Sequence, residues 1–168
     1  MRHLSTYFRA KLDIYNRDTM ISIKKEMELV KSYLAIEQMR YGKRLTVRYD
    51  IEEEVNVDLP SMTIQPLVEN AVQHGLSKKY SGGTLIISIR KEIEGVKIVI
   101  QDDGIGMSEV KKQELMNAET RGIGYINAMK KLKLIKHTQF TLESEEGKGT
   151  KITIIIPGGK FDESSFGR

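Results

Sequence analysis

The run of residues 64–75 has the pattern of a buried helix, yet it holds a carboxylate and an amide in its middle. Glu69 and Asn70 are flanked on both sides by apolar residues. Glutamate is rarely buried without a partner, and an unsatisfied polar group in apolar surroundings costs stability. A protein group, a metal ion or a nucleotide would satisfy these two side chains. A helix that turns both of them to water would need none of these, and the run alone favours neither interpretation.

Asp102 forms a second candidate group, because it ends an apolar stretch and is followed by Gly104 and Gly106. A carboxylate in this place can accept a hydrogen bond from an exocyclic amine such as the 6-amino group of adenine. The glycines let the backbone turn sharply and approach a ligand closely. A plain turn between a strand and a helix has the same pattern, since Asp-Gly is common in turns.

A second pair of glycines, Gly122 and Gly124, opens a helical stretch directly after Arg121. Backbone N–H groups at a helix N-terminus bind anions, so this segment is a candidate phosphate site, with a tight loop as the alternative. Neither glycine pair has the spacing of a dinucleotide-binding or P-loop motif. Thr150 follows a Gly-Lys-Gly turn, where its hydroxyl could support Asp102 directly or through water.

The histidines do not have the spacing of metal ligands. His74 follows the Glu-Asn pair and is expected to reach a phosphate group, whereas His3 and His137 are expected at the surface.

Composition indicates a soluble globular chain of one domain with an appendage: 168 residues, 39% hydrophobic and 30% charged. The net charge of +4 suits a phosphate-bearing partner, but no basic run with interleaved aromatic residues points to nucleic acid. The absence of cysteine excludes disulfides and a cysteine nucleophile. No apolar run reaches the roughly 18 residues of a membrane span, and no signal peptide is recognisable.

Hydrophobic periodicity predicts helices and strands in an order that mixes long crossovers with hairpins. The expected helices are 1–17, 24–41, a region from Pro60 to Gly75, a short helix after Ser108, and 122–135. The expected strands are 45–51, 84–90, 96–101, 138–144 and 150–156. This order predicts an α/β two-layer sandwich, a mixed β-sheet covered on one face by helices, with an N-terminal helical appendage. Residues 158–168 are expected to be a disordered tail.

The four motifs, in this order, resemble the GHKL superfamily with its Bergerat ATP-binding fold, which includes histidine kinases, gyrase-type topoisomerases, Hsp90 and MutL. Residues 60–75 and 26–45 are similar to LytS/YehU-type sensor histidine kinases. The resemblance covers about residues 4 to 157.

The resemblance implies ATP and Mg²⁺ as ligands. Asn70 would be the metal ligand through its side-chain oxygen, and Asp102 would bind the adenine amine. The first glycine pair would shape the adenine pocket and the second the phosphate side. Residues 107–121 would form a short, mobile lid over the nucleotide.

Two positions depart from the family pattern. Gln73 stands where many members have Lys or Arg, so a phosphate contact is lost or passes to His74, Lys78 or Arg121. Pro66 stands where related ATPases place Glu or Asn, which makes Glu69 the candidate for polarising the phosphate acceptor.

The family's phosphoacceptor histidine segment does not occur in the sequence, and residues 3–9 look like the second helix of a dimerisation hairpin. We therefore expect a C-terminal catalytic fragment from the cytoplasmic part of a homodimeric membrane sensor, and we expect this fragment to be unable to autophosphorylate alone. Its partners would be ATP, the upstream phosphoacceptor domain and a response regulator. The expected parts are residues 1–20 as hairpin helix, 21–157 as catalytic domain and 158–168 as tail. Two alternatives stay open: a GHKL protein-serine kinase or ATPase, and a non-catalytic nucleotide-binding module.

Overall fold

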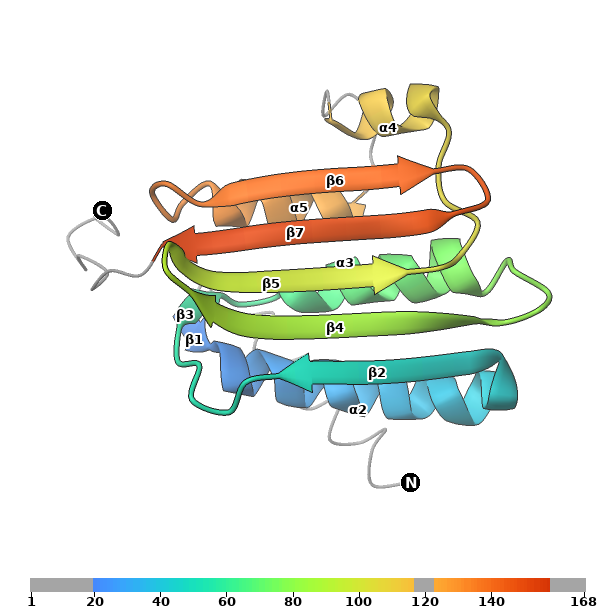
Figure 1. Cartoon of the computed structure of the whole chain (residues 1–168), viewed down its shortest axis with the longest axis horizontal. Helices are drawn as coiled ribbons and strands as arrows, with labels where there is room; N and C mark the ends of the chain where they lie inside the picture. Colours follow the sequence, from blue (N-terminus) through green and yellow to red (C-terminus); the bar gives the residue numbers. More distant parts are fainter. Residues whose placement is uncertain (1–19, 117–122, 158–168) are drawn as a thin grey trace.

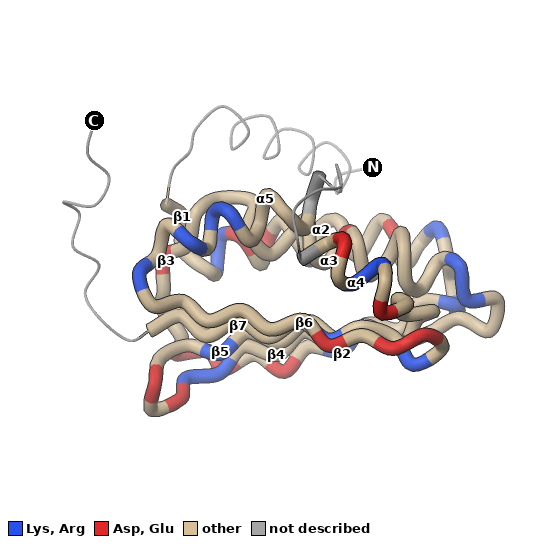
Figure 2. The backbone as a smooth tube through the Cα atoms, turned by 90° about the horizontal axis from the view of Figure 1, so that it is seen from above, with Lys and Arg blue, Asp and Glu red and all other residues tan. Residues whose placement is uncertain are grey.

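A five-stranded sheet with helices on one face forms the body of the protein in the computed structural model, which describes residues 20–116 and 123–157 (Figure 1). The strand order is β2-β4-β5-β7-β6, and only β2 and β4 are parallel. The strands are β2 (Leu45–Ile51), β4 (Gly83–Glu92), β5 (Gly95–Asp102), β6 (Gln139–Glu145) and β7 (Gly149–Pro157). Figure 2 shows the two layers edge-on. The predicted mixed sheet with one helical face is confirmed, whereas the expected appendage helix and tail lie outside the described residues.

The helical layer contains one long helix and several short ones. They are α2 (Ile23–Tyr41), the 3₁₀ turn η1 (Gly42–Arg44), α3 (Ile64–Asn70), the π-helical turn η2 (Ala71–Leu76), α4 (Glu109–Met116) and α5 (Ile123–Leu132). None of the helices in this described part of the chain has the length and apolar character needed to cross a membrane.

Two expected helix ends are placed differently by the structure. Pro60 ends a short strand rather than starting a helix, and α3 begins at Ile64. Gly75 does not close the helix, because the chain continues through η2 to Leu76. Pro66 lies in the first turn of α3, where a missing N–H group costs no intrahelical hydrogen bond.

Two strands of three residues each form a separate antiparallel sheet, β1 (Met20–Ser22) with β3 (Asp58–Pro60). This pair was not predicted from the sequence, because three residues are too few to show a period of two. The pair joins the chain before α2 to the chain before α3.

The core lies between the inner face of the sheet and the helices. On the central strands, alternate residues are buried, as expected for a sheet covered on one side only. The buried side chains include Leu85, Ile87, Ile89, Ile98, Ile100, Ile152, Ile154 and Ile156 from the sheet, and Val30, Leu34, Leu67, Val68, Ala128 and Leu132 from the helices. The outer face carries exposed ion pairs such as Arg90–Asp50, with 2.6 Å between Nη2 and Oδ1.

The strand directions bring several chain ends to one edge of the sheet. β5 ends at Asp102, which is paired with Leu85 near the start of β4 and with Thr150 near the start of β7. Gly75, in η2, lies against the same carboxylate. This edge therefore collects the motifs of residues 69–75, 102–106 and 147–150.

Candidate functional site

Asp102 is a nearly buried carboxyl group at the end of β5, with 4% of its surface exposed. Burial raises its pKa to about 6, although the Gly104 N–H donates to Oδ1 at 2.8 Å and favours the charged form. The negative charge of Asp103 adds to the rise. A buried carboxyl group that keeps acceptor capacity at a sheet edge is suited to bind a donor such as an amine.

Three glycines from three segments pack around Asp102. A β-carbon on Gly75 would lie 2.7 Å from Asp102 Oδ1, and one on Gly104 would lie 2.5 Å from the carbonyl carbon of Gly75. Gly149, with φ +97°, brings its backbone so close that a β-carbon would lie 2.0 Å from the Asp102 carbonyl oxygen. The site is thus built by direct backbone contact, and Gly75 serves this packing rather than ending a helix.

The loop after Asp102 is fastened to the β6–β7 turn. Gly106 adopts φ +65°, and a β-carbon there would lie 1.9 Å from the Glu145 carbonyl oxygen. The Gly147 N–H donates to the Ile105 carbonyl at 2.7 Å. Gly106 therefore allows close contact with the neighbouring turn.

Ser144 is a site residue that the sequence analysis missed. Its hydroxyl accepts a hydrogen bond from the Met107 N–H at 3.0 Å and lies 2.9 Å from the Thr150 hydroxyl. The expected support of Asp102 by Thr150 comes from its main chain, because the Thr150 backbone hydrogen bond lowers the pKa of that carboxyl group. A serine on a strand carries no sequence signal for such a role.

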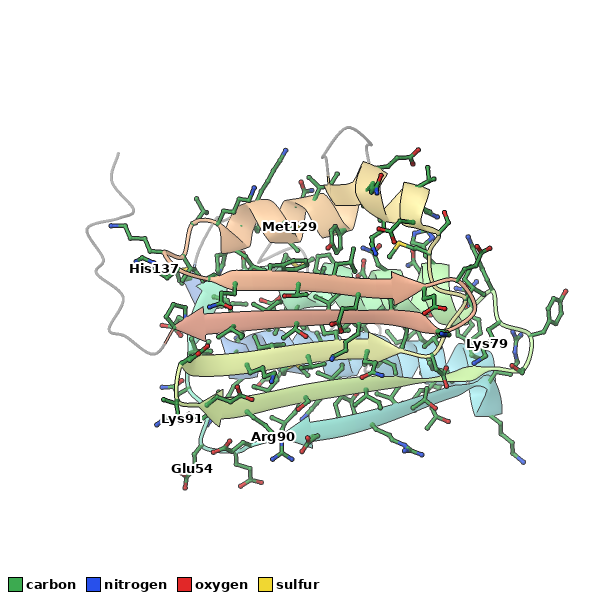
Figure 3. All side chains as sticks on the ribbon, turned by 45° about the horizontal axis from the view of Figure 1, so that its top comes forward. Glu54, Lys79, Arg90, Lys91, Met129 and His137 are labelled. Atoms are coloured by element: carbon green, nitrogen blue, oxygen red, sulfur yellow. The ribbon has the colours of Figure 1, made fainter. Side chains whose placement is uncertain are left out.

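Asp103 and Lys79 brace the same edge from the β4 side. Asp103 Oδ1 accepts from the Thr84 N–H at 2.8 Å, and Lys79 Nζ donates to the Asp103 carbonyl at 2.6 Å. Figure 3 places Lys79 at this edge and His137 at the opposite end of the molecule. His137 is exposed, as predicted, and His3 lies outside the described residues.

Glu69 and Asn70 share the last turn of α3, and both are half-buried. Glu69 Oε1 accepts a hydrogen bond from Gln65 Nε2 at 2.9 Å. None of the hydrogen bonds found between described residues uses the Asn70 side-chain amide. The π-helical turn follows at once, and such turns occur often at functional sites.

His74 extends this group along η2. It is exposed, and partial burial together with the positive charges of Lys78 and Lys111 lowers its pKa. Lys111 belongs to α4, so the charges that act on His74 come from α4 as well as from the loop after η2. Lys111 was not foreseen, because its proximity arises only from the fold.

Of the second glycine pair, only Gly124 is described, in the first turn of α5. Arg121 and Gly122 lie outside the described residues, as does the end of the expected lid. The part of the lid that is described contains α4, the short helix expected after Ser108, and the Lys111 N–H of this helix donates to the Ser108 hydroxyl at 3.4 Å.

Glu26 is a buried charged residue whose role periodicity could not indicate, since it falls within the apolar stripe of α2. It is fully buried, and its Oε1 accepts from the Ile64 N–H at 2.5 Å and the Gln65 N–H at 3.3 Å. Burial raises its pKa to about 7, against the effect of these backbone hydrogen bonds. The first turn of α3 is therefore capped by a side chain from another helix.

Comparison with known proteins agrees with this geometry. The family described as "Histidine kinase-, DNA gyrase B-, and HSP90-like ATPase" matches residues 56–160, more than half of the chain. The chain belongs to this ATPase family. A second family, described as "Histidine kinase", matches residues 1–45 of the same ATPase-family chain.

Relatives of this ATPase-family chain include the sensor histidine kinase YpdA of Escherichia coli, 38% identical over 165 residues, which cover 97% of this chain and 29% of YpdA. The sensor protein LytS of Oceanobacillus iheyensis is 32% identical over 164 residues, covering 92% of this chain and 28% of LytS. The chain thus spans less than a third of either relative. The histidine kinase domain of the Erythrobacter litoralis EL346 blue-light activated kinase shares the fold, with a TM-score of 0.63, 18% identity, and coverage of 92% of this chain and 74% of that one.

Proposed function

We propose that this chain is the ATP-binding catalytic part of a two-component sensor histidine kinase of the LytS/YehU type. The observation that carries the proposal is the buried Asp102 carboxyl group, surrounded by glycines that leave backbone rather than side chains beside it. Residues 21–157 would form the catalytic domain, with 1–20 as the end of a dimerisation hairpin and 158–168 as a tail.

The adenine base fits the edge at Asp102. Oδ1 is engaged by the Gly104 N–H, which leaves acceptor capacity on the carboxyl group for the 6-amino group. Gly75, Gly104 and Gly149 keep the surroundings free of side chains, and Gly106 holds the loop that would border the base. Thr150 and Ser144 would support this border through their mutual contact.

The last turn of α3 would provide one protein ligand for Mg²⁺. Within residues 20–116 and 123–157, no three Asp, Glu or His side chains gather as a metal site. Magnesium commonly binds through one or two side chains, substrate phosphates and waters. The half-buried amide of Asn70 would supply that ligand, and the ion would neutralise phosphate charge.

The phosphate groups would lie near His74, Lys78 and Lys111, since the positive charges of the two lysines act on the imidazole of His74 and lower its pKa. We propose Arg121, Gly122 and Gly124 as further phosphate contacts, and residues 107–121 as the lid. A lid of this kind excludes water while the γ-phosphoryl group is transferred.

The acceptor would be a histidine on an upstream dimerisation hairpin of the longer, homodimeric, membrane-bound parent protein. Glu69 would polarise that histidine, and a response-regulator aspartate would receive the phosphoryl group next. Catalysis would then depend on positioning and charge neutralisation.

Nucleotide binding by the chain tests the core of this proposal. Mg–ADP at about 100 times its Kd should stabilise the folded chain by about 2.7 kcal/mol, seen as a rise in Tm. Asp102→Asn should weaken binding by about tenfold to a hundredfold, the cost of a hydrogen bond to a charged group. Asp50→Asn, on the outer face of the sheet, is the matched control and should leave affinity unchanged. A Tm that does not change when Mg–ADP is added would contradict the proposal.

The type of transfer distinguishes a histidine kinase from a GHKL serine kinase or a non-catalytic module. The chain is incubated with γ-labelled ATP and a separately supplied upstream hairpin from a relative. Acid-labile label on the hairpin supports the histidine kinase, and acid-stable label on a serine supports the serine kinase. Nucleotide binding without any transfer supports the binding module.

A further inference from the structure

The turn that leads into α3 has a strained backbone. Met62 adopts φ +61°, and the Thr63 hydroxyl donates back to the Pro60 carbonyl at 2.5 Å. A left-handed conformation is strained for a residue other than glycine, so it persists only where neighbouring groups hold it. Something outside the turn must therefore fix the start of α3.

Thr63 stands at the N-cap position of α3, where its hydroxyl would normally accept from the first turn. It makes no side-chain cap hydrogen bond there. The N–H groups of Ile64 and Gln65 instead donate to Glu26 Oε1 of α2, 38 and 39 residues earlier. The capping group thus joins two helices.

A third helix holds the same turn from the other side. Lys131 Nζ of α5 donates to the Ser61 carbonyl at 2.8 Å, and its positive charge favours the ionised form of Glu26. The α3 entry is therefore fixed by a carboxyl group from α2 and an ammonium group from α5.

Gln65 connects the contact with Glu26 to the last turn of α3, which carries Glu69 and Asn70. The backbone N–H of Gln65 lies 3.3 Å from Glu26 Oε1, and its side-chain Nε2 lies 2.9 Å from Glu69 Oε1. Asn70 is the next residue of the same short helix. A shift at the start of α3 would thus move both Glu69 and Asn70.

A buried carboxyl group is a costly cap. Glu26 is fully buried, and its Oε2 has no hydrogen-bond partner among the described residues. An apolar side chain of this size would avoid the penalty of burying that oxygen, but could not hold α3 through its N–H groups. The role of this buried carboxyl group is thus to hold the N-terminus of α3 in place.

We propose that Glu26 is a positioning residue of the nucleotide site, which holds α3 so that Asn70 and Glu69 are placed at the phosphate end. The proposal rests on the proposed function, because it assigns Asn70 the metal and phosphate side. It makes α2 a structural part of the site through the contact of Glu26 with the first turn of α3.

The test compares the affinity for ADP with Mg²⁺ and with EDTA, measured by titration calorimetry on the whole chain. Glu26→Met removes the cap at similar size, and Glu26→Gln keeps an acceptor oxygen. Glu37→Met is the matched control. Glu37 is also a buried glutamate of α2, but its Oε2 lies 3.9 Å from Arg40 Nη1, and no described contact joins it to the α3 N-terminus.

We expect Glu26→Met to reduce the Mg²⁺-dependent gain in ADP affinity by about tenfold, about 1.4 kcal/mol. Binding in EDTA, which depends on Asp102, should change by less than about twofold.

Glu26→Gln should restore most of the Mg²⁺-dependent gain, and Glu37→Met should retain it. If Glu26→Met does not fold, Lys131→Met provides a second test. This variant removes the hydrogen bond to the Ser61 carbonyl and should lower part of the Mg²⁺-dependent gain in ADP affinity. An unchanged gain in these variants, or an equal loss with and without Mg²⁺, would overturn the positioning role. Wild-type chain that binds no ADP under either condition would overturn the proposed function first, and this inference with it.

Discussion

The carboxylate of Asp102 lies so close to Gly75 that the smallest side chain does not fit between them. A β-carbon on Gly75 would lie 2.7 Å from Oδ1 of Asp102. The two residues come from η2 and from the end of β5, so their contact joins the helical layer to the sheet edge. It also fixes the carboxylate relative to the turn that carries Asn70.

Gly75→Ala should therefore displace Asp102 and weaken Mg–ADP binding by about tenfold. It should also lower the free energy of unfolding by about 1–3 kcal/mol through overpacking. Gly42→Ala is the control, since Gly42 has φ +57° with open space around it. It should cost about 1–2 kcal/mol of backbone strain without loss of ADP affinity. Equal ADP affinity of Gly75→Ala and wild type, by calorimetry, would contradict this account of the site.

Acidification should weaken nucleotide binding through Asp102. The pKa of this carboxyl group is raised to about 6, and the ionised form is the better acceptor for an amine. ADP affinity should therefore be constant above pH 7 and fall by about tenfold by pH 5, one unit below the pKa. Asp102→Asn should remove most of this dependence in EDTA, where the metal does not contribute. A wild-type profile that stays flat from pH 8 to 5 would exclude an ionised Asp102 as the acceptor.

His74 should gain protons when phosphate binds beside it. Partial burial and the charges of Lys78 and Lys111 lower its pKa in the free protein. A bound diphosphate would offset those positive charges, so the pKa of His74 should rise when ADP is added, followed by NMR of the imidazole protons. Adenosine, which lacks phosphate, should leave the pKa unchanged. A response to adenosine equal to that of ADP would place the phosphates elsewhere.

Glu26 should make the protein less stable as the pH rises. Its pKa is raised from 4.5 to about 7 by burial, so the folded chain binds this proton more tightly than the unfolded chain. Its contribution is fully present below pH 4.5 and is lost as the pH rises through 7, about 3 kcal/mol in all. The difference in free energy of unfolding between wild type and Glu26→Gln, from urea melts, should decline over this range. A constant difference would show that Glu26 keeps its ordinary pKa.

Glycine at position 62 should destabilise the protein less than alanine at the same position. The Met62 φ of +61° is easy for glycine and strained for alanine. Met62→Gly should therefore be more stable than Met62→Ala by about 1 kcal/mol, the reverse of the usual order. Urea melts of the two variants decide, and a more stable alanine variant would show that the turn is not held in this conformation.

The sequence could predict those elements whose signal is local. Strand β2 matches the predicted bounds, because alternation over seven residues is easily read. The predicted end of helix 24–41 is confirmed, because α2 ends at Tyr41 and is followed by Gly42 with φ +57°, and a glycine with positive φ commonly ends a helix. The β1–β3 sheet was missed, because three-residue strands have no readable period and their pairing depends on contacts about 38 residues apart along the chain.

By itself, the sequence determined the order of the five strands of the main sheet and of the helices between them, together with Asp102 and the glycines at the sheet edge, since periodicity and glycine placement are properties of neighbouring residues. The tertiary structure alone decided what those groups touch. Gly75 has the sequence pattern of a helix end, but it is the surface against which Asp102 packs. Glu26 falls in an apolar stripe, but it caps a helix 38 residues further on. Desolvation and hydrogen bonding across elements depend on distances in space, and a linear pattern does not contain these distances.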